Sequence, residues 1–468
     1  MTLRPAAELG EAPGVSLLIV GAGACGLSAA LAARDAGAAP LLVERDASPS
    51  GSTALSSGMI PAAGTRWQRA AGVDDDPARM AADIQGKAHG QAEPGLVETV
   101  CAEAAPCLEW LADRHDVPLS LVEGFRYPGH SRLRMHAPPT RTGAELEGAL
   151  LQATERAGID LVTDAHVTAL FADDAGRVHG VVLTRPDGST ETIACDALVL
   201  ACNGFGGNPA MVRRYLPEMA EAEYFGHPGN QGDAVAWGQA LGAATAGMSA
   251  YQGHGSVAAP HGILITWALM MEGGIQVNAD GERFSNEHDG YSEQAVRVIA
   301  QPGGIAWNLF DDRLLALGRE FEDFRQAEAA GAVRHGADAT ALATACGLPA
   351  APLAATIARC QDLAAGVGSD PFGRDFTGQP ALTAPFHAIR VTGALFHTQG
   401  GLMVDDRARV LRPDASPLPN LFAGGGAACG VSGNAVWGYL SGNGLLTAVT
   451  LGRIAGRAAA GLLHGAVN

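Results

Sequence analysis

Three glycines near the N-terminus have the spacing needed to hold a dinucleotide. Gly21, Gly23 and Gly26 form a Gly-x-Gly-x-x-Gly motif directly after the apolar run 16–20. Gly21 permits a tight turn, Gly23 lets a pyrophosphate approach the backbone, and Gly26 lets helix and strand pack closely. A helical pattern follows, then a second apolar run that ends at Glu44, whose carboxylate would accept hydrogen bonds from ribose hydroxyls. The motif predicts an adenine dinucleotide on a helix N-terminus, and alone it leaves NAD, NADP and FAD open.

The composition limits the classes of function. The chain has 468 residues, of which 47% are hydrophobic and 62 are glycine, so we expect two or three globular domains with substantial cores. A net charge of −18 argues against nucleic acid and anionic membrane surfaces as partners. Since no apolar run reaches about 18 residues, we also expect no membrane span.

The N-terminal residues and the cysteines predict a cytoplasmic protein. Residues 1–14 carry Arg4, Glu8 and Glu11 before any apolar stretch, which does not resemble a signal peptide. The eight cysteines are scattered and contain no Cys-x-x-Cys pair. We therefore expect reduced thiols, without a disulfide framework and without a cysteine-based metal site.

The patterning predicts an α/β fold around the glycine motif. Residues 77–115 show a helical pattern, and residues 166–170, 178–183 and 191–193 show strand patterns separated by turn residues. The very apolar stretch 197–201 follows. This order predicts a Rossmann-like parallel sheet that carries a β-meander insertion.

The middle of the chain predicts a second, inserted domain. Residues 274–284 resemble a hairpin with a turn at Asp280-Gly281, and residues 312–331 and 337–366 resemble Ala-rich helices. Strand patterns return at 386–391, and a final helix is expected over about 445–463. We therefore predict a discontinuous cofactor-binding domain, residues 1–244 and 385–468, and an α+β domain, residues 245–384.

Four further blocks carry a resemblance to a known family. They are residues 51–65, 281–287, 397–401 and 421–446. With the glycine motif, they resemble the flavoprotein family that contains fumarate reductase and succinate dehydrogenase flavoprotein subunits, L-aspartate oxidase and 3-ketosteroid dehydrogenases. The resemblance covers nearly the whole chain. It implies an FAD-binding domain and a mobile capping domain that closes over the substrate.

The resemblance also implies where FAD lies. The loop around Gly58 would follow the isoalloxazine, and the helix that starts near Gly444 would point its N-terminus at the flavin N1/O2 edge. Ser52 and Thr53 stand where covalent members carry a flavin-linking His, so we expect non-covalent FAD. The chain has no Cys-x-x-Cys-His haem motif, so electrons would leave to a diffusible acceptor or a separate partner. The predicted FAD contacts are Gly21, Gly23, Ala24, Cys25, Gly26, Glu44, Arg45, Ser52, Thr53, Ser57, Gly58, Met59, Val167, Asn203, Gly204, Gly425, Gly444 and Leu445.

The substrate positions depart from the fumarate reductase pattern. Fumarate reductases hold a dicarboxylate with two His and two Arg, and one Arg donates the proton. His254 and His397 match the two His positions, whereas Tyr291 and Tyr439 replace the two Arg. Loss of both guanidinium groups removes the bidentate donors that suit a dicarboxylate.

The two tyrosines instead resemble those of 3-ketosteroid dehydrogenases of the Δ4-(5α) type. The similarity lies in two segments, Tyr439-Leu440-Ser441-Gly442 and Asp289-Gly290-Tyr291. A phenol can donate a hydrogen bond to a developing enolate oxygen, and with a lowered pKa it can serve as a base. Ser441 could relay a proton from one phenol. The sequence leaves open which tyrosine polarises the carbonyl and which removes the proton.

We therefore expect an FAD-dependent dehydrogenase that introduces a C=C bond next to the carbonyl of a cyclic or steroid-like ketone. Hydride would pass to flavin N5, and Tyr291, Tyr439, Ser441, His397 and His254 are the candidate catalytic residues. The alternative is a fumarate-reductase-like enzyme of an unsaturated (di)carboxylate. A keto acid, with the histidines on its carboxylate, would combine both. Buried tyrosines in the core, and a histidine that only shapes its turn, are the structural interpretations of the same residues.

Overall fold

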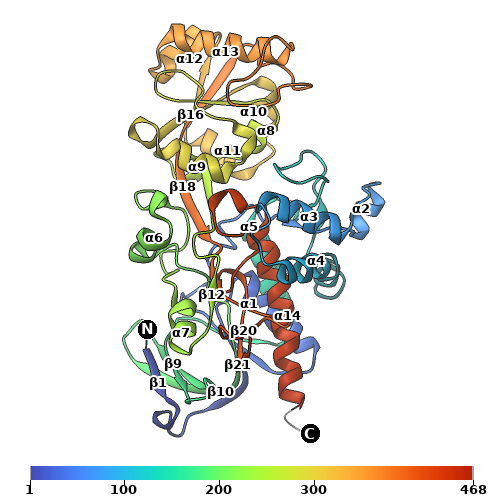
Figure 1. Ribbon diagram of the computed structural model, residues 1–468, viewed down its shortest axis with the longest axis vertical. Helices are drawn as coiled ribbons and strands as arrows, with labels where there is room; N and C mark the ends of the chain where they lie inside the picture. The colour runs from blue at the N-terminus through green and yellow to red at the C-terminus, as the bar shows by residue number, and fades with distance from the viewer. Residues whose placement is uncertain (1, 466–468) are drawn as a thin grey trace.

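Two β-sheets divide the molecule into a lower and an upper lobe, as the computed structural model shows for residues 2–465 (Figure 1). The lower sheet has nine strands in the described residues, with the order β1-β8-β9-β10-β2-β3-β7 and with β21 and β20 branching from β10. The upper sheet has seven, centred on β18, in the order β14-β13-β18-β16-β15 with β11 and β17 also paired to β18. This mixed α/β architecture is the predicted fold class.

The parallel part of the lower sheet brings several loops to one edge. In its centre β10 (Thr190–Leu200) lies between β2 (Gly14–Val20) and β21 (Pro417–Ala423), and Leu198 pairs with both Leu18 and Leu421. These strands are apolar because helices or other chain segments cover both faces. The carboxyl ends of parallel strands share one edge of a sheet, so the glycine motif and the segments after β10 and β21 meet there. On the other side of β2, β3 (Pro40–Val43) and β7 (Asp160–Val162) continue the parallel pairing.

The predicted β-meander is present, with one correction. It consists of β8 (His166–Ala172), β9 (Val178–Thr184) and the first half of β10. The stretches 191–193 and 197–201 were expected to be separate strands, but β10 runs from 190 to 200 without a break. Its first half pairs with β9 antiparallel and its second half pairs with β2 in parallel, so one strand serves both parts of the sheet.

Two helices in close contact hold the chain's ends together. They are α1 (Ala24–Asp35), which follows the glycine motif, and α14 (Asn443–Gly465), the predicted final helix. A Cβ at Gly456 would lie 2.0 Å from the carbonyl oxygen of Ala29. The backbones can therefore approach so closely only because α14 carries glycine at the contact. Figure 1 shows α14 running down one side of the lower lobe, behind which α1 lies.

The upper lobe differs from its prediction in the lengths of its elements. The expected helix 312–331 is two helices, α10 (Asp312–Gly318) and α11 (Glu322–Ala329). The expected helix 337–366 is likewise α12 (Ala339–Cys346) and α13 (Ala350–Ala364), separated by Gly347 with φ of +69°. Left-handed backbone at a glycine ends a helix, which explains the second break.

The predicted hairpin at 274–284 is wrong in its second half. The turn exists, with the Gly281 N–H donating to the Asn278 carbonyl at 3.1 Å. However, β15 (Ile275–Val277) pairs with β16 (Ile305–Asp311), and no strand forms at 283–284. Arg283 is used elsewhere, because its guanidinium forms ion pairs with Glu287 and Asp370.

The other helices and strands complete the two lobes. The bounds 1–244, 385–468 and 245–384 for the two domains remain predictions. The remaining strands are β1 (Thr2–Pro5), β4 (Ile60–Pro61), β5 (Ser120–Leu121), β6 (Met135–Ala137), β11 (Glu223–Tyr224), β12 (Thr245–Ala246), β13 (Tyr251–Ala258), β14 (Ile263–Leu264), β17 (Val333–Gly336), β18 (Phe386–Thr398), β19 (Gly401–Leu402) and β20 (Arg409–Leu411). The remaining helices are α2 (Arg66–Ala70), α3 (Pro77–Lys87), α4 (Pro94–His115), α5 (Gly143–Arg156), α6 (Pro209–Tyr215), α7 (Asp233–Ala240), α8 (Ala268–Met271) and α9 (Tyr291–Ile299).

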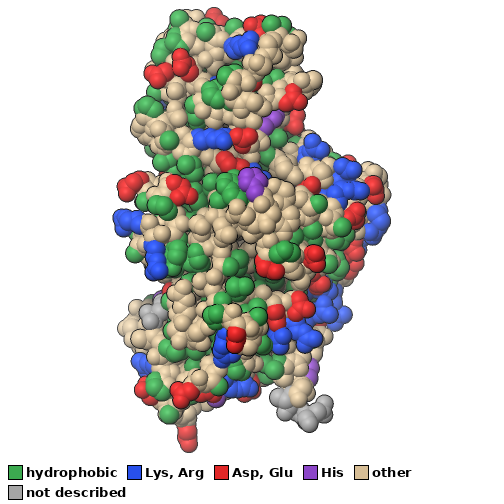
Figure 2. Space-filling model, in the orientation of Figure 1, with side chains coloured by type: hydrophobic (Ala, Val, Ile, Leu, Met, Phe, Trp, Pro, Cys, Tyr) green, Lys and Arg blue, Asp and Glu red, His purple; other side chains and the backbone are tan. Residues whose placement is uncertain are grey.

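The surface carries both signs of charge. On the face shown in Figure 2, basic side chains gather mainly at the edge near α2 and α3, where acidic side chains lie among them. Within residues 2–465, no helix combines the length and the apolar character that crossing a membrane requires. A cytoplasmic location remains a prediction.

Candidate active site

A long cavity connects the carboxyl edge of the lower sheet with the upper lobe. It encloses about 2030 Å³ free of protein atoms, part of it open to solvent. The glycine motif and the ends of β3 and β10 line one end, which we call the cofactor end. Aromatic side chains from both lobes line the other, which we call the substrate end.

Glycines shape the cofactor end. Gly21 has φ of +104°, and a Cβ there would lie 2.5 Å from the Ala201 carbonyl oxygen at the end of β10. A Cβ at Gly26 would lie 1.8 Å from the Gly21 carbonyl oxygen. Gly23 precedes α1 and carries no side chain that could cover the helix N-terminus. The backbone is therefore open to a phosphate at the position where the motif predicts one.

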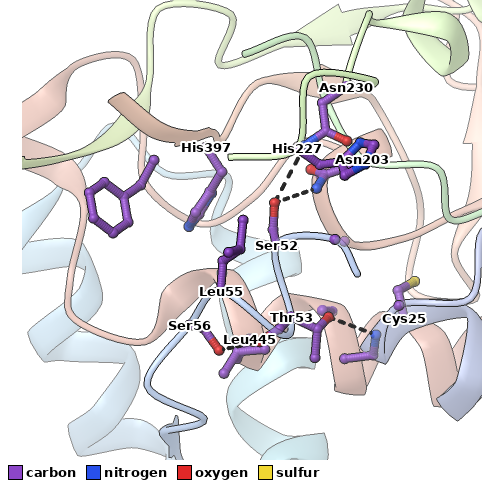
Figure 3. A pocket seen from close by; sticks show the side chains of 18 of the residues that line it. Cys25, Ser52, Thr53, Leu55, Ser56, Asn203, His227, Asn230, His397 and Leu445 are labelled. Carbon is purple, nitrogen blue, oxygen red and sulfur yellow. Dashed lines mark hydrogen bonds between the residues drawn. The ribbon is translucent and has the colours of Figure 1, made fainter. Parts of the chain in front are cut away.

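Side chains around this turn hold it in place. The Glu44 carboxylate accepts hydrogen bonds from the backbone N–H groups of Ala22, at 2.9 Å, and of Asp46, at 3.1 Å. The Thr53 hydroxyl accepts from the Ala24 N–H at 2.9 Å, at the start of α1. Figure 3 shows Thr53 facing this helix start. These contacts fix Glu44 and Thr53 beside the space for a dinucleotide.

A short segment crosses over the cofactor end. We call residues 225–231 the strap. The Arg45 guanidinium donates to the Gly229 carbonyl at 2.7 Å and lies 3.0 Å from His227 Nδ1. Asn230 lies 3.5 Å from the Ser52 hydroxyl, on which the Asn203 amide also converges at 2.8 Å (Figure 3). The strap and the Ser52 loop thus enclose the cavity from two sides.

The loop after Ser52 is locked against the start of α5. Gly58 has φ of +63°, and a Cβ there would lie 2.5 Å from the Thr142 carbonyl oxygen. The Gly143 N–H donates to the Ser56 carbonyl at 2.6 Å. Gly58 itself faces away from the cavity, while its neighbours Ser57 and Met59 line it. In this loop it is therefore Ser57 and Met59, next to the glycine, that line the space for a cofactor.

Most predicted FAD contacts lie together in the cavity wall. Gly26, Gly58 and Gly204 do not line the cavity and serve close packing instead; a Cβ at Gly204 would lie 2.0 Å from the Thr398 hydroxyl. The predicted residues that line it are Gly21, Gly23, Ala24, Cys25, Glu44, Arg45, Ser52, Thr53, Ser57, Met59, Val167, Asn203, Gly425, Gly444 and Leu445.

The substrate end brings the two predicted tyrosines together from distant parts of the chain. Tyr291 begins α9 in the upper lobe, and Tyr439 precedes α14. Their ring centroids lie 6.2 Å apart. His254 on β13 stacks on Tyr291 at 4.6 Å, and His397 on β18 contacts Tyr439 edge-on at 5.5 Å. Together with Ser441, these five predicted catalytic side chains all line the cavity.

Burial keeps both phenols protonated. It raises the pKa of Tyr291 well above 10, as does the neighbouring Tyr439, while a hydrogen bond with Ser441 acts in the opposite direction. Burial also raises the pKa of Tyr439. The backbone N–H groups of Gly444 and Gly442 and the Tyr291 hydroxyl act in the opposite direction. The Gly444 N–H donates to the Tyr439 hydroxyl at 3.4 Å. At neutral pH both tyrosines are hydrogen-bond donors.

The two histidines are neutral. Burial lowers the pKa of His254 to about 3, and its Nδ1 has no hydrogen-bond partner among the described residues. Burial lowers the pKa of His397 to about 4, although the Thr398 carbonyl acts in the opposite direction. His397 Nδ1 also lies 3.1 Å from the Gln399 amide nitrogen. Neither histidine supplies a positive charge to a carboxylate near pH 7.

Several lining residues were missed from the sequence. Tyr127 lies 6.1 Å from Tyr291 between ring centroids, and Trp267 lies 6.4 Å from Tyr291. Arg141 lines the cavity beside Phe321. These residues belong to irregular segments without periodicity or motif. One feature of the sequence could have pointed to Arg141: it directly precedes Thr142, which caps α5.

The fold and the glycine cradle define a flavoprotein. A family model described as an FAD binding domain matches residues 16–445. The chain belongs to this family, which confirms the predicted FAD and the predicted resemblance. The cavity fits the cofactor, because the N-terminus of α1 is open at Gly23 and further glycines line the cavity between there and α14.

Two known proteins to which the chain is similar are oxidoreductases. It is 29% identical to a probable fumarate reductase from Shewanella frigidimarina, over 98% of the chain and 77% of that protein. It is 27% identical to 4-oxocyclohexanecarboxylate 2-dehydrogenase from Sinomonas cyclohexanicum, over 96% of the chain and 93% of that protein.

A solved structure extends this similarity. The 3-ketosteroid-Δ4-(5α)-dehydrogenase from Rhodococcus jostii RHA1, in complex with 4-androstene-3,17-dione, matches with a TM-score of 0.77 and 26% identity. The match covers 98% of this chain and 100% of that one. The protein is therefore an FAD-dependent oxidoreductase that acts on CH–CH groups.

Proposed function

We propose that the protein desaturates a cyclic ketone and forms the C=C bond next to its carbonyl. The observation that carries this proposal is the pair Tyr291 and Tyr439, which face one cavity where α14 begins. FAD, when bound, supplies the acceptor for the hydride that leaves the β-carbon. The protein must then polarise the carbonyl and accept the α-proton.

The environment of each tyrosine supports a division of roles. Both are protonated, so either can donate to the carbonyl oxygen as enolate charge develops. Tyr439 has more groups that stabilise its anion, namely the N–H groups of Gly442 and Gly444 and the Tyr291 hydroxyl. We therefore assign removal of the α-proton to the phenolate of Tyr439, which forms when its own proton passes to solvent before the reaction. Polarisation of the carbonyl falls to the protonated Tyr291, which Ser441 supports by a hydrogen bond.

Similar proteins support a ketone. One relative is named for oxidation of 4-oxocyclohexanecarboxylate, and one similar structure contains a steroid ketone. The alternative, a reductase or dehydrogenase of an unsaturated acid, is supported by the fumarate reductase relative. Against it, tyrosines stand at the two positions where arginines would hold a dicarboxylate, and His254 and His397 are neutral.

An anaerobic substrate panel tests the proposal. The FAD-loaded protein is mixed with 4-oxocyclohexanecarboxylate, with saturated 3-ketosteroids and with succinate, and loss of the flavin absorbance is followed. We expect at least one ketone to bleach the flavin and to yield the α,β-unsaturated ketone as product. Bleaching by succinate and by no ketone would overturn the proposal.

Non-covalent attachment of FAD and a diffusible electron acceptor remain predictions. Release of free FAD by acid tests the non-covalent attachment.

A further inference from the structure

The substrate end holds one permanent positive charge. In residues 2–465, the arginines that line the cavity are Arg45 and Arg141, and no lysine does. Arg45 lies at the cofactor end, where Gly229 and His227 occupy its guanidinium. The histidines of the substrate end are neutral. Arg141 is therefore the group at this end able to attract an anion near pH 7.

The backbone of Arg141 is held rigidly. Its φ is +55°, a left-handed conformation that is unusual for a residue with a side chain. Its N–H donates to the Pro138 carbonyl at 3.0 Å, and the next residue, Thr142, caps α5. Gly143 then bonds to the Ser56 carbonyl of the predicted flavin loop. Unusual backbone that is fixed on both sides is typical of functional positions.

The Arg141 side chain is under-used in the protein itself. Its one side-chain hydrogen bond in the described residues reaches Glu320 of the upper lobe at 3.5 Å, and its guanidinium lies 5.7 Å from the centre of the Phe321 ring. A guanidinium has five N–H donors in a planar fork that suits a carboxylate. Most of these donors are therefore free to bind a ligand.

An aromatic wall joins this cation to the tyrosine pair. Phe321, Tyr127 and Tyr291 line the cavity, and Tyr127 contacts Tyr291 at 6.1 Å between ring centroids. Phe125 does not line it but links Phe321, at 5.7 Å, to Tyr127, at 5.1 Å. Such a wall suits an apolar ring. The ligand that matches it has a carbonyl at one end, a hydrocarbon ring, and an anionic group at the other.

We infer that Arg141 binds the carboxylate of a cyclic keto acid while Tyr291 and Tyr439 act on its ketone. The inference rests on the proposed function, and it makes Arg141 the specificity-determining residue. Glu322 and Asp323 also line the cavity, although Glu322 is paired with Arg325. Their negative charge disfavours a dianion, so a single carboxylate matches the site better than a dicarboxylate.

Paired substrates separate recognition of the carboxylate from chemistry at the ketone. The probes are 4-oxocyclohexanecarboxylate and its methyl ester, which differ only in the charged end. For Arg141→Met we expect KM for the acid to rise about 10-fold or more, with kcat little changed, because one charge-assisted contact is lost. KM for the ester should stay within about two-fold. Arg141→Lys should recover part of the acid's affinity. Arg185→Met, at a half-buried arginine that is paired with Glu191 and does not line the cavity, is the matched control.

A second variant distinguishes ligand binding from contact between the lobes. Glu320→Gln removes the negative charge of the Arg141–Glu320 ion pair and keeps the guanidinium, so KM for the acid should stay the same or fall. Equal losses for acid and ester in Arg141→Met, reproduced by Glu320→Gln, would overturn the inference. Binding of acid and ester is also followed through the shift of the flavin spectrum. If no ketone is oxidised, the proposed function fails, and this binding comparison still decides the role of Arg141.

Discussion

The two ends of the cavity are built in different ways. At the cofactor end, backbone groups and glycines make the surface, and Gly21 and Gly26 allow contacts that any Cβ would block. At the substrate end, side chains from both lobes make the surface, and Tyr291 and Tyr439 come from positions far apart in the chain. Shape therefore decides function at the first end, whereas the chemical identity of a few side chains decides it at the second.

The largest predicted effect is at the cofactor end, in Gly26→Ala. The added methyl would lie 1.8 Å from the Gly21 carbonyl oxygen, so the turn predicted to receive the pyrophosphate must move. We expect the purified variant to be colourless or poorly folded, which FAD content and circular dichroism measure.

Gly86→Ala is the matched control for this variant. Gly86 lies inside α3, and its Cβ position has no atom within 4 Å. Alanine there should retain FAD and raise stability by about 0.5–1 kcal/mol, because it favours the helix. Normal FAD content in Gly26→Ala would contradict the view that the shape of the backbone decides whether FAD binds at the cofactor end.

The second effect is chemical, in Tyr439→Phe. Removal of the hydroxyl leaves the ring and its packing but removes the proposed proton acceptor, so the rate of flavin reduction by a ketone should fall about 10²–10⁴-fold. FAD content should not change. The control is Tyr251→Phe, at a buried tyrosine that bonds to Glu218 and does not line the cavity. A near-normal rate in Tyr439→Phe would remove Tyr439 from the chemistry.

This contrast explains how much could be predicted from the sequence. Gly21, Gly23 and Gly26 were predictable because a turn that must accept a pyrophosphate tolerates little else, and the motif is local. Tyr439 was found only through resemblance to a family. Arg141 was not found at all, because nothing in its local segment shows that the chain's folding brings it to a cavity.

Prediction of the fold from the sequence met the same limit, because only local patterns could be read. The apolar runs predicted the parallel strands and the final helix, since burial leaves a local pattern. The continuity of β10 across 190–200 was missed, because its change from antiparallel pairing with the neighbouring β9 to parallel pairing depends on β2, which is remote in the sequence. The false strand at 283–284 has a similar cause, since Arg283 is drawn to Glu287 and Asp370.

A third prediction concerns pH. The pKa of His254 is about 3 and that of His397 about 4 in the folded protein, below the ordinary value of 6.5. At a pH between the folded and the ordinary pKa values, these histidines bind more protons in the unfolded chain than in the folded protein. The free energy of unfolding is therefore highest above about pH 6.5 and falls as the pH is lowered toward 4. Each such histidine contributes up to about 1.4 kcal/mol per pH unit.

Urea unfolding at pH 7 and pH 5 measures this effect. The decrease should be smaller in His254→Phe and unchanged in the exposed control His464→Gln. With a neutral ketone, kcat/KM should show no inflection near pH 6.5, because neither histidine titrates there in the folded protein. An inflection that disappears in His397→Asn would show that a charged histidine acts at the substrate end.

The smallest predicted effect returns to the cofactor end, where Arg45 holds the strap. Its guanidinium donates to the Gly229 carbonyl at 2.7 Å and contacts His227, so it connects the end of β3 to residues 225–231 across the cavity. Arg45→Met keeps the length of the side chain but loses these hydrogen bonds, which are worth about 1–3 kcal/mol for a charged donor. FAD should dissociate about 5- to 100-fold faster, as followed by the return of free flavin fluorescence, while flavin reduction by a ketone in the loaded enzyme stays near normal. Arg34→Met, at an arginine that bonds to Ala157 outside the cavity, is the control. If Arg45→Met slows flavin reduction instead of loosening FAD, then the strap positions the substrate, and the two ends of the cavity are not as independent as their construction indicates.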